Sequence, residues 1–404
     1  MLVPFGLGYF LSYLFRAVNA VVAPDLVSQL GLTASELGVL TAAYLFAFAC
    51  FQLPLGVLLD RYGPRRVQFV LLLLAGAGAA LFAYGSSVWP LAAARALIGM
   101  GFAGGLMSGF KAVVLWVPEQ RRALANSLVM SLGAVGLLSA TSPMELAVQA
   151  YGWRTVFLGL ALVTCAIGFL ILLAVPERTP AASGDTLGQQ VGVIGEILSD
   201  RAFWRLAPLL AATAGTHIAI QTLWAGPWFR DVAGLDRMAA ANHLFIMAAA
   251  FFVGILVSGA LTDWFVRRGV SELDVMLGFL VVFLSAQALI ILDVKAMRIP
   301  AWIAFGMAGQ TAILAYPWLS KHFGAKRSGR ANTAMNLLIF GAAFLAQSAI
   351  GGIIDTFPRL QGGGFGVEAY RTAFGIFWLI EIAGLTWYLP QRRKLLATKP
   401  PSVG

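Results

Sequence analysis

The sequence predicts an all-α polytopic membrane protein with twelve transmembrane helices, because charge is scarce, apolar runs are long and one pattern repeats. Of its 404 residues, 59% are hydrophobic and 11% are charged, whereas soluble domains carry about 25% charged residues. The runs 67–84, 156–175 and 275–292 contain no Asp, Glu, Lys or Arg. Each is long enough to cross a hydrocarbon layer of about 30 Å as a helix. No segment shows the alternating polarity of membrane β-strands.

The predicted spans run from residues 3–23 to residues 371–390. With both termini in the cytoplasm, 18 of the 28 Lys and Arg residues fall in cytoplasmic segments and 7 on the opposite side. Such an excess of cations in cytoplasmic loops sets the orientation of membrane helices. We therefore expect an integral multi-pass protein, in the cytoplasmic (inner) membrane if its source is bacterial.

An internal repeat divides the spans into two pseudo-symmetric six-helix bundles, residues 1–175 and 203–390, with a cytoplasmic tail at 391–404. The segment GVLLD at 56–60 recurs as GALTD at 259–263, an offset of 203 residues. Parallel repeats of this kind occur in transporters whose two bundles rock about a central site.

The bundles are joined by a polar stretch at 176–202, for which we keep two interpretations. Leu187, Val191, Ile194 and Leu198 recur every three or four residues, a spacing that indicates a short interfacial helix on the cytoplasmic surface. A linker without regular structure is the simpler alternative.

Several function classes are disfavoured by composition. The net charge of +10 comes from short turns between apolar segments and forms no basic face for nucleic acid. Cys50 and Cys165 both lie within apolar segments, so no disulfide framework is expected. We find no phosphate-binding loop for ATP, and no cluster of catalytic groups. We expect neither an enzyme nor a bound cofactor or metal.

Two motifs now carry a family resemblance. Residues 56–66 read GVLLDRYGPRR, which resembles the major facilitator superfamily loop motif G-x-L-x-D-R-x-G-x-[KR]-[KR]. Residues 95–103 read RALIGMGFA, similar to the family's second motif, R-x-x-x-G-x-G-x-A. The resemblance implies twelve helices and alternating access. Because it has an arginine in its first span, the chain resembles the organic-anion and sugar-phosphate permease branches of this superfamily.

The resemblance also implies a conformational latch between the two halves in the outward-open state. Physically, Asp60 is an anion at a helix end, suited to a neighbouring helix N-terminus or to Arg121. Plain positive-inside topology is the alternative explanation of these charges. The implied latch residues are Gly56, Asp60, Arg61, Arg65 and Arg121, with Asp263 in a weaker, pseudo-symmetric part.

In this family the first and fourth helices of each half line the substrate cavity. In the first span, Arg16 lies about 12 Å along the helix from Pro24, and Asn19 shares its face. The fourth span carries Ser108 and Lys111 on a polar face. An arginine this deep is expected to face a cavity or a partner, and both readings stay open. Lys111 either faces the cavity or snorkels to the cytoplasmic surface.

The sign of these charges predicts the substrate class. Arg16 and Lys111 lie in cavity-lining spans that contain no Asp or Glu in their membrane parts, so two cations are expected there without a fixed anion. Arginine's planar fork suits a carboxylate or phosphate, and lysine adds a mobile point charge. A metal cation or protonated amine would instead need a carboxylate in this path.

The second half adds polar and aromatic groups to the predicted site. The seventh span places His217, Gln221, Trp224 and Trp228 on one helical face, and the tenth offers Gln310. His217 is a candidate for proton coupling. The alternative is a buried, neutral histidine that has a purely structural role. The other proton-coupling candidates are the intramembrane carboxylates Glu145 and Glu381.

We therefore expect a secondary transporter for a small organic anion, a carboxylate or phosphate ester, with proton symport favoured over exchange. Its partners would be that substrate and the bilayer, with the chain acting as a monomer. Alternatives are an exporter of an amphipathic drug or siderophore and, less favoured, a transporter-like sensor. The fifth span lacks the Gly-Pro-x-x-Gly-Gly core of drug antiporters, which counts against multidrug export.

Overall fold

The structure, a computed structural model, describes residues 2–177, 187–309, 311–360 and 363–397. Over these ranges the regular elements are helices, and an isolated antiparallel β-bridge joins Arg359 and Phe365. Two compact units are present. Unit 1 comprises Met1–Leu187 and Thr222–Phe245, and unit 2 comprises Gly188–Gln221 and Ile246–Gly404.

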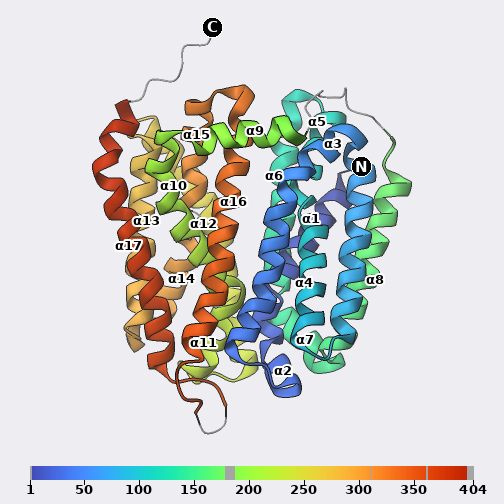
Figure 1. Cartoon of the computed structure of the whole chain (residues 1–404), viewed down its shortest axis with the longest axis vertical. Coiled ribbons are helices and arrows are strands. Elements are labelled where there is room, and N and C mark those ends of the chain that lie inside the picture. The colour runs from blue at the N-terminus through green and yellow to red at the C-terminus, as the bar shows by residue number, and fades with distance from the viewer. Residues whose placement is uncertain (1, 178–186, 310, 361–362, 398–404) are drawn as a thin grey trace. The chain divides into compact units, whose positions relative to one another are not determined.

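Unit 1 is a helical bundle in which α3 packs along α4 and α8, and α1 packs along α6 (Figure 1). Its helices are α1 (Val3–Ala17), α2 (Asn19–Leu30), α3 (Ala34–Tyr84), α4 (Val88–Phe102), α5 (Gly105–Trp116), η1 (Glu119–Arg121), α6 (Arg122–Ser139), α7 (Ser142–Tyr151), α8 (Trp153–Ala174) and α11 (Ala225–Asp231), with the start of α12 (Arg237–Val266).

Unit 2 is a second bundle, in which α10 packs against α16 and α17, and α13 against α14. It contains α9 (Leu187–Leu198), α10 (Arg201–Ala219), the first two residues of the π-helical turn η2 (Ile220–Trp224), the rest of α12, α13 (Glu272–Ile291), η3 (Lys295–Met297), α14 (Arg298–Ala308), η4 (Thr311–Ala315), α15 (Tyr316–Phe323), α16 (Ala325–Ile354) and α17 (Val367–Ala397).

The longest helix, α3, joins two spans that the sequence predicts separately. It begins at a capping box, in which Thr33 and Glu36 bond each other's backbone N–H groups. It is interrupted at Gly63, whose φ of 77° lies in the left-handed region that favours glycine. By length and composition, ten helices of the described residues, or eleven with the bent α1–α2 pair, could cross a membrane. Counting α3 twice would give twelve, a number that stays a prediction.

Several spans predicted as continuous helices are interrupted. α1 and α2 meet at Val18 with a bend of 44°, and α4 gives way to α5 at Ala103 and Gly104. α6 ends before Thr141, and α10 continues through the π-helical turn. Interrupted helices near the bilayer midplane free backbone groups to face a solute. The break in the first span is therefore a candidate position for a binding site in unit 1.

Close backbone contacts hold the helices of unit 1 together. A methyl group at Gly99 of α4 would lie 2.2 Å from the carbonyl oxygen of Tyr44 in α3. One at Gly136 of α6 would lie 2.0 Å from the carbonyl oxygen of Phe10 in α1. Small residues at such crossings let membrane helices touch without a side chain between them. These contacts fix α1 and α3, which carry Arg16 and Tyr44.

The segment 222–245 follows α10 in the chain but belongs to unit 1. Its helix α11 packs on α2, where a methyl group at Gly226 would lie 2.4 Å from the carbonyl oxygen of Ala20. The first residues of α12 continue along the same unit. The predicted bundle boundaries at 175 and 203, which rest on the repeat, remain a prediction.

In the stretch between the predicted bundles the structure has a helix, α9. Ile194 and Ile197 are buried on one side of it, while Val191 is 52% exposed. Figure 1 shows α9 running across the ends of the longer helices of unit 2. Residues 178–186 lie outside the described ranges, and contact of α9 with the membrane surface stays a prediction.

Candidate functional site

Arg16 lies in the last turn of α1, one residue before that helix ends, and its side chain is half-buried. Its guanidinium carbon sits 4.7 Å from the ring centre of Tyr13 and 5.0 Å from that of Phe48. Aromatic faces attract a cation and, being apolar, keep water away from it. The rings of Tyr13 and Phe48, called the aromatic walls below, therefore flank a partly dehydrated positive charge at the break in the first span.

Two further residues fix the backbone on which Arg16 stands. Arg95 of α4 is fully buried and its Nη1 donates to the carbonyl oxygen of Phe15 at 2.7 Å. Its guanidinium carbon lies 4.9 Å from the ring centre of Tyr44, whose hydroxyl donates to the carbonyl oxygen of Ser12 at 3.2 Å. Two carbonyls in the turn that precedes Arg16 are thus held from α3 and α4. Tyr44 was missed from the sequence, and Arg95 was noted only as a motif residue.

The other polar residues predicted for the first half are deeply buried. Asn19 donates through Nδ2 to Oγ1 of Thr41 at 2.8 Å, which ties α2 to α3. Ser108 is fully buried, and its Oγ has no hydrogen-bond partner within the described part of the chain. Gln68 of α3 is equally buried, and neither polar atom of its amide is bonded among the described residues. Binding of substrate by Asn19 and Ser108 remains a prediction.

The prediction that Lys111 is a cation without a fixed anion beside it is wrong. Its ammonium group forms an ion pair with Oδ1 of Asp60 in α3 at 2.5 Å, and both side chains are a little under one-third exposed. The acid lies on a different helix, 51 positions earlier in the chain. Inspection of the cavity-lining spans alone could not reveal this pairing. The prediction of an anionic substrate therefore depends on Arg16.

The same pair revises the predicted latch, because Asp60 was expected to meet Arg121 or a helix N-terminus. Arg65 donates from Nε to the carbonyl oxygen of Leu172 at 3.0 Å and pairs with Glu177 at 3.2 Å, so it is anchored to the end of α8. Arg61, Arg121 and Asp263 are exposed, and Gly56 lies one turn before Asp60 in α3. A latching role for this set stays a prediction.

We expect Asp60→Asn and Lys111→Met each to slow transport about tenfold, because each variant leaves a partly buried charge without its partner. The apparent Kd for substrate should change less than twofold. Uptake rates and thermal-shift titrations would measure the two quantities separately. The exchange variant Asp60→Lys/Lys111→Asp should recover part of the rate. Full activity of both single variants would show that the pair has no role in turnover.

A second charged cluster joins the start of α12 to the first half of the chain. Arg237 donates to both carboxylate oxygens of Asp25, at 3.0 and 2.7 Å. Its Nε also donates to Glu145 of α7 at 2.8 Å. Glu145, predicted as a proton-coupling candidate, is buried and also accepts from Gln149 at 2.8 Å. This cluster, Asp25–Arg237–Glu145, lies within unit 1, and its Asp25 and Arg237 were not singled out from the sequence.

In the second half, His217 is enclosed by phenylalanine rings. Its ring lies 5.6 Å from Phe251, 5.0 Å from Phe305 and 5.9 Å from Phe283, measured between ring centres. A methyl group at Gly309 would lie 2.1 Å from the imidazole. The histidine therefore packs as a core aromatic in this state. Its role in proton coupling stays a prediction.

The predicted face of the seventh span is not a regular α-helical face. Gln221 and Trp224 lie in the π-helical turn η2, whose wider winding changes the direction of the side chains that follow. Both residues are buried, as is Trp228 in α11. Gln310 lies outside the described residues. Substrate binding by these residues remains a prediction.

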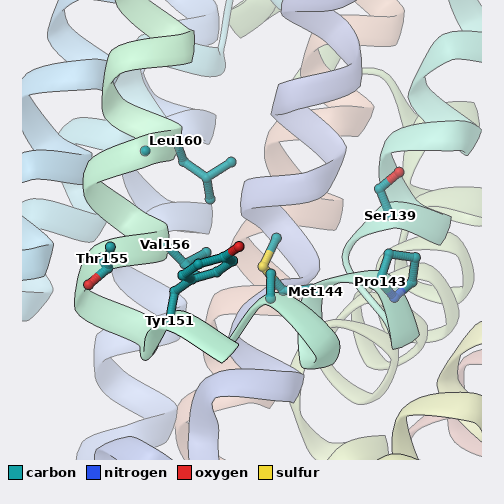
Figure 2. Close-up of a pocket in the computed structure, with 9 residues that line it drawn as sticks. Ser139, Pro143, Met144, Tyr151, Thr155, Val156 and Leu160 are labelled. Atoms are coloured by element: carbon teal, nitrogen blue, oxygen red, sulfur yellow. The ribbon is translucent and has the colours of Figure 1, made fainter. Parts of the chain in front are cut away.

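Unit 1 has a cavity of about 350 Å³ between α7 and the start of α8. Met144 and Tyr151 line it on one side and Leu160 on another (Figure 2). None of the predicted site residues lines it. Its remaining lining residues are Ser139, Pro143, Ala147, Thr155, Val156 and Gly159. The cavity is therefore separate from the site around Arg16.

The chain resembles several curated bacterial transporters. It is 26% identical over 275 residues to a probable sulfoacetate transporter of Cupriavidus necator, covering 64% of each chain. It is 25% identical to the D-galactonate transporter of Escherichia coli, covering 65% of this chain and 66% of that one. A chloramphenicol resistance protein of Streptomyces lividans is 28% identical, with 67% of each chain covered. The matched parts thus span about two thirds of these relatives.

Comparison with solved structures and with family profiles agrees on the fold. A bacterial homologue of the human lysosomal transporter Spinster, in an inward-facing and occupied conformation, aligns with a TM-score of 0.78 at 18% identity. The alignment covers 100% of this chain and 98% of that one. The family profile described as Major Facilitator Superfamily matches residues 5–347. The chain is thus an integral multi-pass membrane transporter, not an enzyme, and belongs to the Major Facilitator Superfamily.

Proposed function

We propose that this transporter moves a small organic anion, a carboxylate or phosphate ester, which is bound by Arg16. The observation that carries the proposal is the position of this guanidinium, half-buried between Tyr13 and Phe48 at the break in the first span. A planar guanidinium binds a carboxylate or phosphate through two parallel hydrogen bonds. Removal of water by the aromatic walls strengthens that attraction.

The rigid backing of Arg16 supports a binding role. Arg95 and Tyr44 hold the carbonyl groups of Phe15 and Ser12, so the part of α1 that leads to Arg16 is restrained from two neighbouring helices. A binding group that is already oriented loses less conformational freedom when the ligand arrives. Two relatives also favour an anion, since sulfoacetate and D-galactonate, the substrates in their names, both carry a carboxylate.

Electrostatics favours coupling to protons if the direction is uptake. Moving one negative charge into a cell that is negative inside costs about 2.3 kcal/mol for each 100 mV. A proton carried with the anion cancels that cost. We therefore propose proton symport by alternating access, in a chain that acts as a monomer. Exchange of one anion for another also cancels the charge and is the alternative mechanism.

The first experiment is a thermal-shift titration of the purified protein with sulfoacetate, D-galactonate, galactose and chloramphenicol. We expect the two anions to raise the Tm progressively, with the logarithm of their concentration once it exceeds the Kd. Galactose tests whether the charge is needed, and chloramphenicol tests the drug-export alternative that one relative favours. Uptake of the better anion into proteoliposomes, with and without an inward proton gradient, then tests coupling. Stabilisation by galactose or chloramphenicol alone would overturn the proposal.

A further inference from the structure

Two buried carboxyl groups in the described part of the chain have different partners. Glu145 of unit 1 is 2% exposed and pairs with the guanidinium of Arg237. Glu381, in the middle of α17 in unit 2, is fully buried and bonds to an uncharged amide. A charge that is removed from water needs a compensating charge or several hydrogen-bond donors. Glu145 has such a charge beside it, whereas the hydrogen-bond partner of Glu381 is neutral.

The partner of Glu381 is Gln287 of α13, which is 2% exposed. Its Nε2 donates to Oε2 of the carboxyl group at 2.5 Å. The other oxygen of each group, Oε1 of Glu381 and Oε1 of Gln287, is enclosed and has no hydrogen-bond partner within the described residues. Both atoms are acceptors when the glutamate is ionised. Each of the two groups therefore keeps one buried acceptor atom without a hydrogen bond in the described residues.

No charged group of the described residues supplies what is missing. The neighbours that act on the carboxyl group are Gln287 and the hydroxyl of Thr216 in α10. Next to Thr216, His217 turns its ring toward Phe251 and Phe305. α16 also packs on α17, and its charged residues all lie at its start, no later than Arg330.

We propose that Glu381 and Gln287 form a proton-binding site in the core of unit 2, which holds one proton in this state. Protonation turns Oε1 of Glu381 into an O–H donor, and the carbonyl oxygen of Gln287 is an acceptor without a partner. A carboxylic acid and a primary amide can then bond each other twice. One proton thus removes the net charge and supplies the missing donor.

The site joins helices that belong to different parts of the bundle. Glu381 lies on α17, Gln287 on α13 and Thr216 on α10. The close approach of α17 to α10 is visible at Gly384, where a methyl group would lie 3.1 Å from Cα of Leu209. Use of this proton in coupling rests on the function proposed above. The protonated pair itself does not.

The test is infrared spectroscopy of the purified full-length protein near neutral pH. Wild type should show the carbonyl band of a protonated, hydrogen-bonded carboxyl group, and Glu381→Gln should lose that band. Because an amide can still bond Gln287, Glu381→Gln should keep the wild-type Tm, whereas Glu381→Ala should lower it by about 5 °C or more. The matched control Glu145→Gln removes a carboxyl group that pairs with Arg237 and should leave the band intact.

The exchange variant Glu381→Gln/Gln287→Glu moves the acid to the other helix and should restore the band while keeping the wild-type Tm. Absence of the band in wild type, or its survival in Glu381→Gln, would overturn the proposal. So would a Glu381→Gln variant as unstable as Glu381→Ala, since that result requires a charged glutamate. Thermal shifts with D-galactonate, measured on the same samples, report the anion site separately, so failure of either proposal can be recognised alone.

Discussion

Arg16→Ala is expected to lower kcat/KM for anion uptake at least about 100-fold while the protein still reaches the membrane. Truncating one partner of a desolvated, hydrogen-bonded charge pair costs about 2–5 kcal/mol, and each 1.4 kcal/mol is a factor of ten in rate. The guanidinium packs against Tyr13 and Phe48 rather than across a backbone crossing. Its loss should therefore spare the fold. Uptake into proteoliposomes at several substrate concentrations measures the effect.

Two variants make this result specific. Arg16→Lys keeps the charge but loses the planar fork, so partial activity with a raised KM is expected. Arg267→Ala removes an exposed arginine from unit 2 and should leave uptake unchanged. The thermal shift with D-galactonate should disappear in Arg16→Ala. Retention of both the shift and the uptake rate would remove Arg16 from the binding site and with it the main support for an anion.

The second large effect is expected from Arg237→Asp, which places a third carboxylate beside Asp25 and Glu145. Breaking a largely buried ion pair and adding like charges costs several kcal/mol, so the segment 222–245 should leave α2 and α7 more often. Ala241, one turn further along α12, is 2% exposed. With Cys50 and Cys165 replaced by serine, Ala241→Cys should be labelled at least about tenfold faster in the Arg237→Asp background.

Restoring one opposite charge should reverse this change. Addition of Asp25→Arg to Arg237→Asp is expected to slow labelling again, because an ion pair of reversed direction forms. Asn242→Ala is the matched control, since it removes a neutral hydrogen bond of 2.7 Å to Ser142 in the same region. It should change labelling much less. Equal labelling rates in wild type and Arg237→Asp would show that this cluster does not hold the segment.

The charged groups show which features of the site can be predicted from local sequence patterns. Arg16 could be singled out because its depth in an apolar span is a property of the local sequence. The ion pair of Lys111 with Asp60 could not, because the partners lie 51 positions apart on different helices. The same holds for Arg237 and Asp25, which are 212 positions apart. For Glu381 the sequence indicated an unusual carboxyl group. Its partner Gln287 could be identified only from the packing of α13 against α17.

The sequence by itself determined that this chain is a helical membrane transporter of the Major Facilitator Superfamily. Low charge, apolar runs and the motif at 56–66 are local properties, and in lipid the backbone must satisfy its own hydrogen bonds, which leaves the helix as the available element for such runs. Only the tertiary structure decided which charges are neutralised, where helices break, and how Arg95 and Tyr44 brace Arg16. Those outcomes depend on contacts between distant helices, which small residues such as Gly99 permit.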